Sequence, residues 1–216
     1  MDGLTSQQIR DADLADWRKL ALALHARFRT GDFASGLRFV TALTELAERV
    51  NHHPDVTLTY PHVDLRLISH DVGAVTQRDI DLARQISELA REQGVPADPR
   101  AVTQLELALD TADLAAVGPF WAALLHGDPD AASDGPDIVD PTGQLPTLWF
   151  QSTEPHETPR QRFHVDLWVP YDVAEGRIAA AVAAGGRVVD DSRAPSFVVV
   201  ADLDGNRACV CTFLDV

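Results

Sequence analysis

The sequence predicts an α+β protein of two units, of which the first is an antiparallel sheet with helices on one face. Three observations predict this class. Apolar residues recur at three- and four-residue steps over 33–50, the spacing of a buried helix face. Two β-rich segments follow at 56–60 and 63–68, and the second alternates apolar and charged residues as a half-buried strand does. A stretch at 94–100, with one glycine and two prolines between periodic regions, predicts a linker.

The linker at 94–100 divides the 216 residues into a unit at 1–93 and a unit at 101–216. Either half is long enough to bury a modest core of its own. We therefore expect two small domains in series.

The strongest element of the first unit is the helix over 33–50. Its end is expected near Asn51, because Pro54 disfavours helical geometry at the residue before it. The apolar stripe expected to face the core comprises Phe33, Leu37, Val40, Leu43, Leu46, Ala47 and Val50.

Weaker patterns complete the first unit. Helical spacing of apolar residues over 14–24 predicts a further helix, and a strand is expected to begin near 26–28. The short link at 61–62 predicts a hairpin between the two β-rich segments. Thr76 is suited to cap a helix running from about 77 to 91.

In the second unit, a strand–helix–strands pattern occurs twice, and we expect a paired βαβββ arrangement. A loop rich in Asp, Pro and Gly at 127–146 interrupts the first copy. The expected strands are 104–109, 147–151, 163–169, 187–190, 196–201 and 208–214, and the expected helices are 114–125 and 173–184.

Composition narrows the possible partners. The formal net charge of −15 repels phosphate backbones and anionic lipid, which argues against nucleic acid and membrane surfaces. No apolar run approaches the length of a membrane span, and the polar start at 1–10 is unlike a signal peptide, so a cytoplasmic location is expected. Cys209 and Cys211 lie two residues apart in one expected strand and are poorly placed to bond to each other, so no disulfide between them is expected.

Histidines gather where elements of the first unit end. His52 and His53 lie at the end of the long helix, His70 ends the second strand of the hairpin, and Asp79 opens the next helix. A histidine with an ordinary pKa of about 6.5 can give or take a proton near neutral pH. Such a cluster suits a reaction that needs an acid and a base and no metal or redox cofactor.

Two other interpretations of the histidines remain open. A His-His pair at a helix C-terminus is also favoured by the helix dipole, and it can serve only as a cap. Three histidines can also bind zinc, with Glu48 and Asp71 as the nearest acidic residues. His62, in the turn, is expected to be a solvated loop residue.

The first unit resembles the pterin-4a-carbinolamine dehydratase family over roughly 4–93. The residues that carry the resemblance are Glu48–Asp55, Tyr60, Val63, Ser69–Asp71, Gly73, Thr76–Asp79, the opening Leu4-Thr5 and Trp17. The departures are Val56 and Thr57, where the family often has an aromatic residue, Ser69 in place of Thr, and Ala74 in place of Gly.

The resemblance implies a dehydratase that converts 4a-hydroxytetrahydropterin to quinonoid dihydropterin and water, without a cofactor. It implies His52, His53 and His70 as catalytic residues and leaves open which is acid and which is base. Supporting or substrate-binding roles are implied for Glu48, Pro54, Ser69, Asp71 and Asp79. It also implies a homo-oligomer that acts on a small-molecule pterin.

The second unit is similar to the glyoxalase-like group of the vicinal oxygen chelate fold over about 101–216. The matching residues are Asp113-Leu114, Phe120–Leu125, His164–Leu167 and Asp202–Asn206, and the last of these is expected to be a tight turn. Metal enzymes of this fold take His and Glu ligands from several strands. Here Glu106 replaces the first histidine and Cys209 replaces the last glutamate, so we expect no catalytic metal, although His164 is kept.

The sequence thus predicts a carbinolamine dehydratase fused to a glyoxalase-like module. Two alternatives come from other classes of protein. The dehydratase fold could serve as a non-catalytic interaction module, or the main function, as a lyase or small-molecule binder, could lie in the second unit. The intact His52, His53 and His70 favour retained catalysis.

Overall fold

The chain forms two compact units, Met1–Gln104 and Leu105–Val216. The computed structural model describes residues 3–102, 104, 106–128, 137–140, 142–155, 164–169 and 171–212. Among these residues, no helix combines the length and the apolar character needed to cross a membrane.

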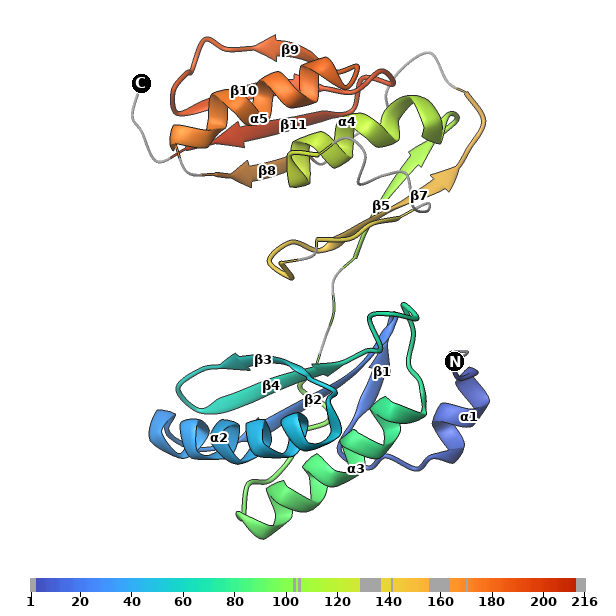
Figure 1. The fold of residues 1–216 in the computed structure, drawn as a ribbon. Coiled ribbons are helices and arrows are strands. Elements are labelled where there is room, and N and C mark those ends of the chain that lie inside the picture. The colour runs from blue at the N-terminus through green and yellow to red at the C-terminus, as the bar shows by residue number, and fades with distance from the viewer. Residues whose placement is uncertain are drawn as a thin grey trace. The chain divides into compact units, whose positions relative to one another are not determined.

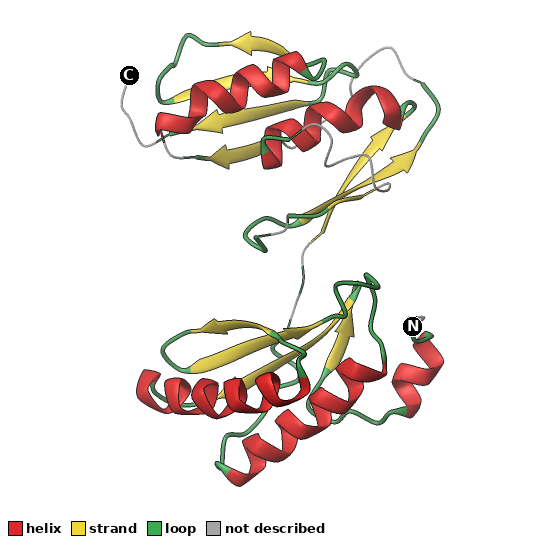
Figure 2. Cartoon of the chain, in the orientation of Figure 1, coloured by secondary structure: helices red, strands yellow, loops and turns green. Residues whose placement is uncertain are grey.

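The N-terminal unit is a four-stranded antiparallel sheet in the order β1-β2-β4-β3 (Figure 1). Figure 2 shows α2 and α3 together on one face of this sheet, which confirms the predicted fold class. In chain order the elements are α1 (Ser6–Asp11), β1 (Arg18–Leu20), β2 (Ala23–Arg29), α2 (Phe33–Val50), β3 (Asp55–Leu58), β4 (His62–Leu67) and α3 (Gln77–Glu92).

Alternation along β4 separates a core face of the sheet from a polar one. Val63, Leu65 and Leu67 are buried, and the side chains between them are partly exposed. Phe28 of β2 packs against Phe39 of α2, with ring centroids 5.2 Å apart. Burying each of these large side chains contributes roughly 1.5–3 kcal/mol, so the sheet–helix layer holds the unit together.

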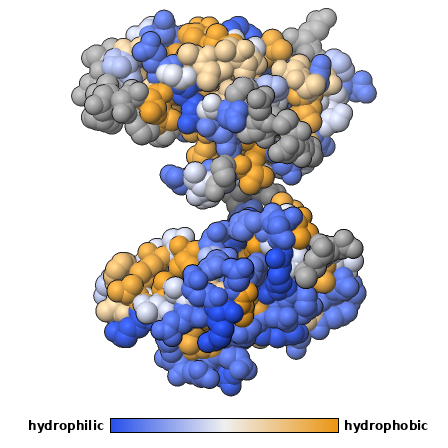
Figure 3. Space-filling model, viewed as in Figure 1, coloured by the Kyte–Doolittle hydropathy of each residue, from blue (hydrophilic) through white to orange (hydrophobic). Residues whose placement is uncertain are grey.

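Helix α2 has the predicted bounds but a different buried stripe. The side chains facing the core belong to Phe39, Leu43, Leu46 and Ala47. Phe33 and Leu37, which were expected in the core, are 51% and 53% exposed. Hydrophobic side chains accordingly reach the surface over α2, whereas the surface over α3 is mostly hydrophilic (Figure 3).

The helix predicted over 14–24 is absent, and this prediction was wrong. The chain there forms β1 and the start of β2, which pair as a hairpin. Ala21 reverses the chain with a φ of 44°, in the left-handed region. The apolar spacing gave a wrong prediction of a helix because Leu22 is exposed at this turn and does not belong to a buried stripe.

The segment expected as a linker packs against the N-terminal unit. Ala97 forms a bridge with Phe28, and the Arg29 amide donates to the Pro96 carbonyl at 2.8 Å. Val95 and Ala97 also pack against the hydrophobic core. Residues 95–98 therefore cover the edge of the core beside β2.

The C-terminal unit contains two sheets built on one plan. One sheet has the order β8-β11-β10-β9, and its β8–β11 pair is parallel while its other pairs are antiparallel. The other sheet has the order β5-β7-β6, in which β7 is parallel to β5 and antiparallel to β6. The elements are β5 (Glu106–Thr111), α4 (Leu114–His126), β6 (Asp137–Ile138), β7 (Thr147–Ser152), β8 (Val165–Trp168), α5 (Tyr171–Ala183), β9 (Arg187–Asp190), β10 (Phe197–Ala201) and β11 (Arg207–Cys211).

The second copy is thus a complete βαβββ unit, and the first has a strand, a helix and two strands among the described residues. The expected strand ends at Phe163 and Leu214 lie outside the described residues. In the core, Trp121 of α4 donates from Nε1 to the buried Asp202 Oδ2 at 2.9 Å. Asp202 also accepts from the Asn206 amide, so one carboxylate ties α4 to the tight turn after β10.

Candidate functional site

The end of α2 directs His52 into the protein. Asn51 takes up a left-handed conformation with φ 48° and ψ 45°, and its amide donates to the carbonyls of Ala47 and Glu48. The His52 amide then donates to the Ala47 carbonyl at 3.2 Å, which closes the helix end as a left-handed cap does. The chain turns, and the His52 side chain becomes buried, with 9% of the residue exposed.

The buried carboxylate of Asp79 receives the His52 ring. His52 Nε2 lies 2.7 Å from Asp79 Oδ1, and Asp79 is 0% exposed. Its other oxygen, Oδ2, accepts from the Ser69 hydroxyl at 2.7 Å and from the Thr76 amide at 2.7 Å. Thr76 and Asp79 form the capping box that starts α3, so the same residues begin a helix and fix the acid.

The contact favours one tautomer of His52. An ionised carboxylate only accepts hydrogen bonds, so opposite an ionised Asp79 the Nε2 of His52 donates, and the lone pair of the neutral ring lies on Nδ1. A ring held in one orientation by a buried carboxylate is suited to exchange a proton at its free nitrogen.

His70 follows the end of β4, at the start of a tight turn. The Ser69 amide donates to the Ala74 carbonyl, and the Ser69 carbonyl accepts from the amides of Val72 and Gly73. His70 itself is exposed, and within the described part of the chain no hydrogen bond or ion pair holds its ring. Ser69 binds Asp79, so the strand end that carries His70 is linked to the residue that holds His52.

His53 and Glu48 form a second histidine–carboxylate pair, at the surface. Nε2 of His53 lies 3.1 Å from Glu48 Oε1, and the side chains are 52% and 70% exposed. An exposed pair of this kind adds little to stability, about 0–1 kcal/mol. The pair orients the imidazole of His53, which follows the buried His52 in the chain.

The remaining predicted residues have structural contacts. Asp71 pairs with Arg78 of α3, and this hydrogen bond holds the pKa of the Asp71 carboxyl below its ordinary value. Pro54 is half-buried after the two histidines. A hollow of about 700 Å³ in the same unit is lined by other residues, among them Leu14, Arg84 and Val95, and by none of the predicted catalytic histidines.

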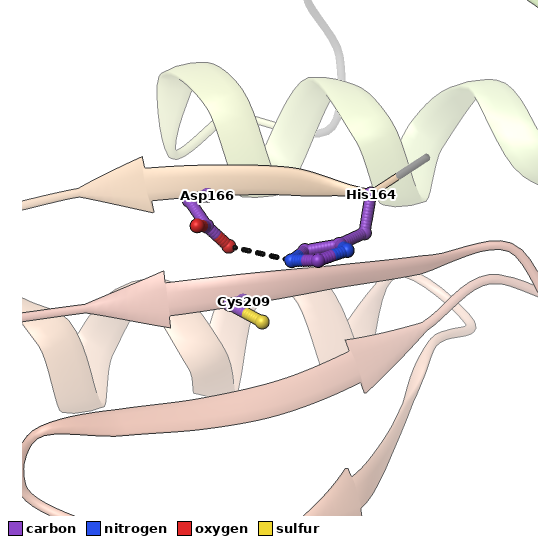
Figure 4. A group of neighbouring side chains, drawn as sticks. All are labelled: His164, Asp166 and Cys209. Carbon is purple, nitrogen blue, oxygen red and sulfur yellow. Dashed lines mark ion pairs between the residues drawn. The ribbon is translucent and has the colours of Figure 1, made fainter. Parts of the chain in front are cut away.

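The C-terminal unit brings a different group together. His164, Asp166 and Cys209 offer ligand atoms that all lie within 4.8 Å of one another, and Figure 4 shows them across neighbouring strands. His164 Nε2 is 3.2 Å from Asp166 Oδ1. The Glu106 side chain, the other ligand position weighed from the sequence, lies outside the described residues.

Two residues were not given a role in a site from the sequence. Thr76 was expected as a helix cap and as part of the family resemblance, but not as a donor to Asp79, although a threonine three residues before an aspartate already indicates a capping box. Asp166 was part of a motif but not a candidate ligand. Its position two residues after His164 puts both on one face of a strand, which is a signal that alternation supplies.

The fold and the site define a two-unit α+β protein with a buried histidine–carboxylate pair in its first unit and a βαβββ plan in its second. The sequence model described as pterin 4 alpha carbinolamine dehydratase matches residues 2–89. The model described as glyoxalase-like domain matches residues 106–211. The predicted fusion is therefore confirmed.

Individual relatives match the first unit. A Thermosynechococcus vestitus protein, provisionally named a pterin-4-alpha-carbinolamine dehydratase, is 42% identical over 79 residues, which are 37% of this chain and 83% of the relative. A similarly named Nocardia farcinica protein is 40% identical over 90 residues, covering 41% and 95% of the two chains. A crystal structure from Brucella melitensis, titled transcriptional coactivator/pterin dehydratase, is 30% identical over 41% of this chain and 99% of its own, with a TM-score of 0.40.

Through its N-terminal half, the chain belongs to the pterin-4a-carbinolamine dehydratase family. A glyoxalase-like domain follows in the same chain.

Proposed function

We propose that the N-terminal unit dehydrates a 4a-hydroxytetrahydropterin to quinonoid dihydropterin and water. The observation that supports this most is the buried pair of His52 and Asp79, 2.7 Å apart, in a unit of the pterin dehydratase family. Three further donors, from Ser69 and Thr76, hold the Asp79 carboxylate, so the imidazole of His52 is fixed before substrate arrives.

The reaction needs two proton transfers. The bond between C4a and its hydroxyl oxygen breaks, and that oxygen takes up a proton to leave as water. The neighbouring N5–H loses its proton, and its electron pair forms the new C=N bond. Nothing is oxidised or reduced overall, so a positioned acid and a positioned base are sufficient.

The three histidines differ in burial and in how their rings are held for these proton transfers. His52 offers Nδ1 from a ring fixed by Asp79, which acts as a positioning residue. His53 and His70 are exposed and can exchange protons with both substrate and water. Glu48 orients His53, and Ser69 supports the Asp79 carboxylate. The proposal leaves open which histidine is the acid.

The test follows the disappearance of enzymatically generated 4a-hydroxytetrahydropterin by absorbance. The intact chain is compared with His52→Ala, His53→Ala and His70→Ala. Removing a general acid or base is expected to lower kcat by about 10²–10⁴-fold. We expect a loss in this range in at least one variant, because each transfer requires a correctly placed group.

His62→Ala is the matched control. His62 lies in the same unit and pairs with Asp64 at 3.4 Å, outside the network of Asp79. Its removal is expected to leave the rate unchanged. Folded protein without any acceleration would refute the proposal and would favour an interaction module or a function in the C-terminal unit.

A further inference from the structure

The second unit carries one further group of ligating side chains. Among the described residues, His164, Asp166 and Cys209 are the only set of three or more His, Cys, Asp or Glu residues close enough to hold a metal ion. They combine a nitrogen, an oxygen and a sulfur donor. Thiolate and imidazole ligands together favour zinc, whereas magnesium and calcium favour oxygen ligands.

The sheet register brings the three residues together. β8 and β11 run parallel, and Cys209 lies directly opposite Asp166 in the ladder. His164 immediately precedes β8 and is two residues from Asp166, so both side chains project from the same face. Figure 4 shows the His164 ring directed toward Asp166, with the Cys209 sulfur on the adjacent strand.

The spacing suits a small tetrahedral site. With zinc about 2.0–2.3 Å from each ligand, donor atoms of one site lie about 3.3–3.7 Å apart. The three donor atoms here lie within 4.8 Å of one another, and His164 Nε2 and Asp166 Oδ1 are already 3.2 Å apart. The side chains of His164 and Asp166 are 58% and 50% exposed, so small rotations can bring them onto an ion.

The Asp166 carboxylate and the Cys209 thiol lie side by side on paired strands. A divalent cation between them would attract both groups, because it is the largest local charge in such a site.

We propose that His164, Asp166 and Cys209 form a zinc-binding site with a fourth position open to solvent. This site differs from the incomplete ligand set weighed from the sequence, because Asp166 supplies the third ligand and the second βαβββ unit supplies all three. It is independent of the dehydratase proposal, which concerns the other unit. Either can fail without the other.

The test uses Co²⁺ as a spectroscopic substitute for zinc on the intact, chelator-treated chain. A cobalt–thiolate bond gives a near-ultraviolet charge-transfer absorption that histidine and carboxylate ligands do not give. We expect this band in the wild type at one equivalent of Co²⁺, and its loss on addition of Zn²⁺. Histidines of the N-terminal unit cannot produce this band, so the band distinguishes binding at Cys209 from Co²⁺ bound by those histidines.

The chain supplies a matched control. Cys211 lies two residues from Cys209 on β11, is buried, and is not part of the cluster. We expect Cys209→Ala to abolish the band and Cys211→Ala to keep it. Asp166→Ala, at an exposed position that leaves the core intact, is expected to weaken Co²⁺ binding at least about tenfold.

Circular dichroism would establish that each variant is folded. A wild-type chain without the thiolate band would overturn the proposal. So would a band that persists in Cys209→Ala, one that disappears in Cys211→Ala, or Co²⁺ affinity that is unchanged in Asp166→Ala.

Discussion

At the scale of single residues, Asp79 holds the His52 side chain in place. It is completely buried, accepts hydrogen bonds from Ser69 and Thr76, and holds His52 through Nε2. The sequence identified both His52 and Asp79 as candidates, because a helix end and the next helix start carry them. It could not place Nε2 of one against Oδ1 of the other, since that contact depends on how the two helices pack.

Replacing Asp79 with Asn tests its positioning role. An amide can donate to His52 Nε2 and so stabilise the opposite tautomer, which moves the lone pair away from Nδ1. We expect kcat to fall by about 10–100-fold with little change in KM, and the pH profile of kcat to change. Steady-state kinetics on the folded variant would check this.

Ser69→Ala is the comparison for Asp79→Asn. It removes one donor to the carboxylate but leaves the charge and the contact with His52. We expect a smaller kinetic loss and destabilisation of about 1 kcal/mol, measured by urea unfolding. Equal kinetic losses in the two variants would show that Asp79 acts through general stability rather than through the His52 tautomer.

At the scale of elements, helices and strands with clear periodicity were predictable and exposed turns were not. The helix at 33–50 has the predicted bounds because Asp32 caps one end and Asn51 with Pro54 closes the other. The segment 14–24 failed because its apolar residues belong to two short strands joined at Ala21. Periodicity alone does not reveal a turn made by a residue without a turn signature.

The exposed face of α2 carries a prediction about assembly. Phe33 and Leu37 lie one helical turn apart and are both about half exposed, as an interface between copies of a chain would require. We propose that this face joins copies of the chain, and we expect Leu37→Asp to form a smaller species than the wild type in sedimentation velocity. The exposed Gln85→Asp, on α3, serves as a control for added charge. A wild-type monomer would contradict this prediction.

At the scale of the whole molecule, each unit has a hydrophobic core of its own. The N-terminal core draws on residues from Leu4 to Ala97, and the C-terminal core on residues from Leu107 to Val210. The glycine and prolines at 94–100 predicted a boundary in this part of the chain, and the two compact units divide after Gln104. That this region also packs beside β2 depends on tertiary contacts, such as Phe28 with Ala97, that no local pattern encodes.

Separate expression tests this organisation. The fragment 1–104 is expected to fold and to keep the dehydration rate of the intact chain within about twofold, since a unit with its own core can fold alone. The shorter fragment 1–93 lacks Val95, Ala97 and the Arg29–Asp98 ion pair, and it is expected to melt at a lower temperature. Equal melting temperatures would contradict the packing of 95–98.

We propose above all that the histidines of the N-terminal unit catalyse the dehydration of 4a-hydroxytetrahydropterin. The first experiment compares the first-order loss of this compound with no protein, with the intact chain, and with the double variant His52→Ala/His53→Ala. We expect acceleration that is proportional to the concentration of the intact chain and absent with the double variant. A folded chain that leaves the uncatalysed rate unchanged, or equal acceleration by the double variant, would contradict it.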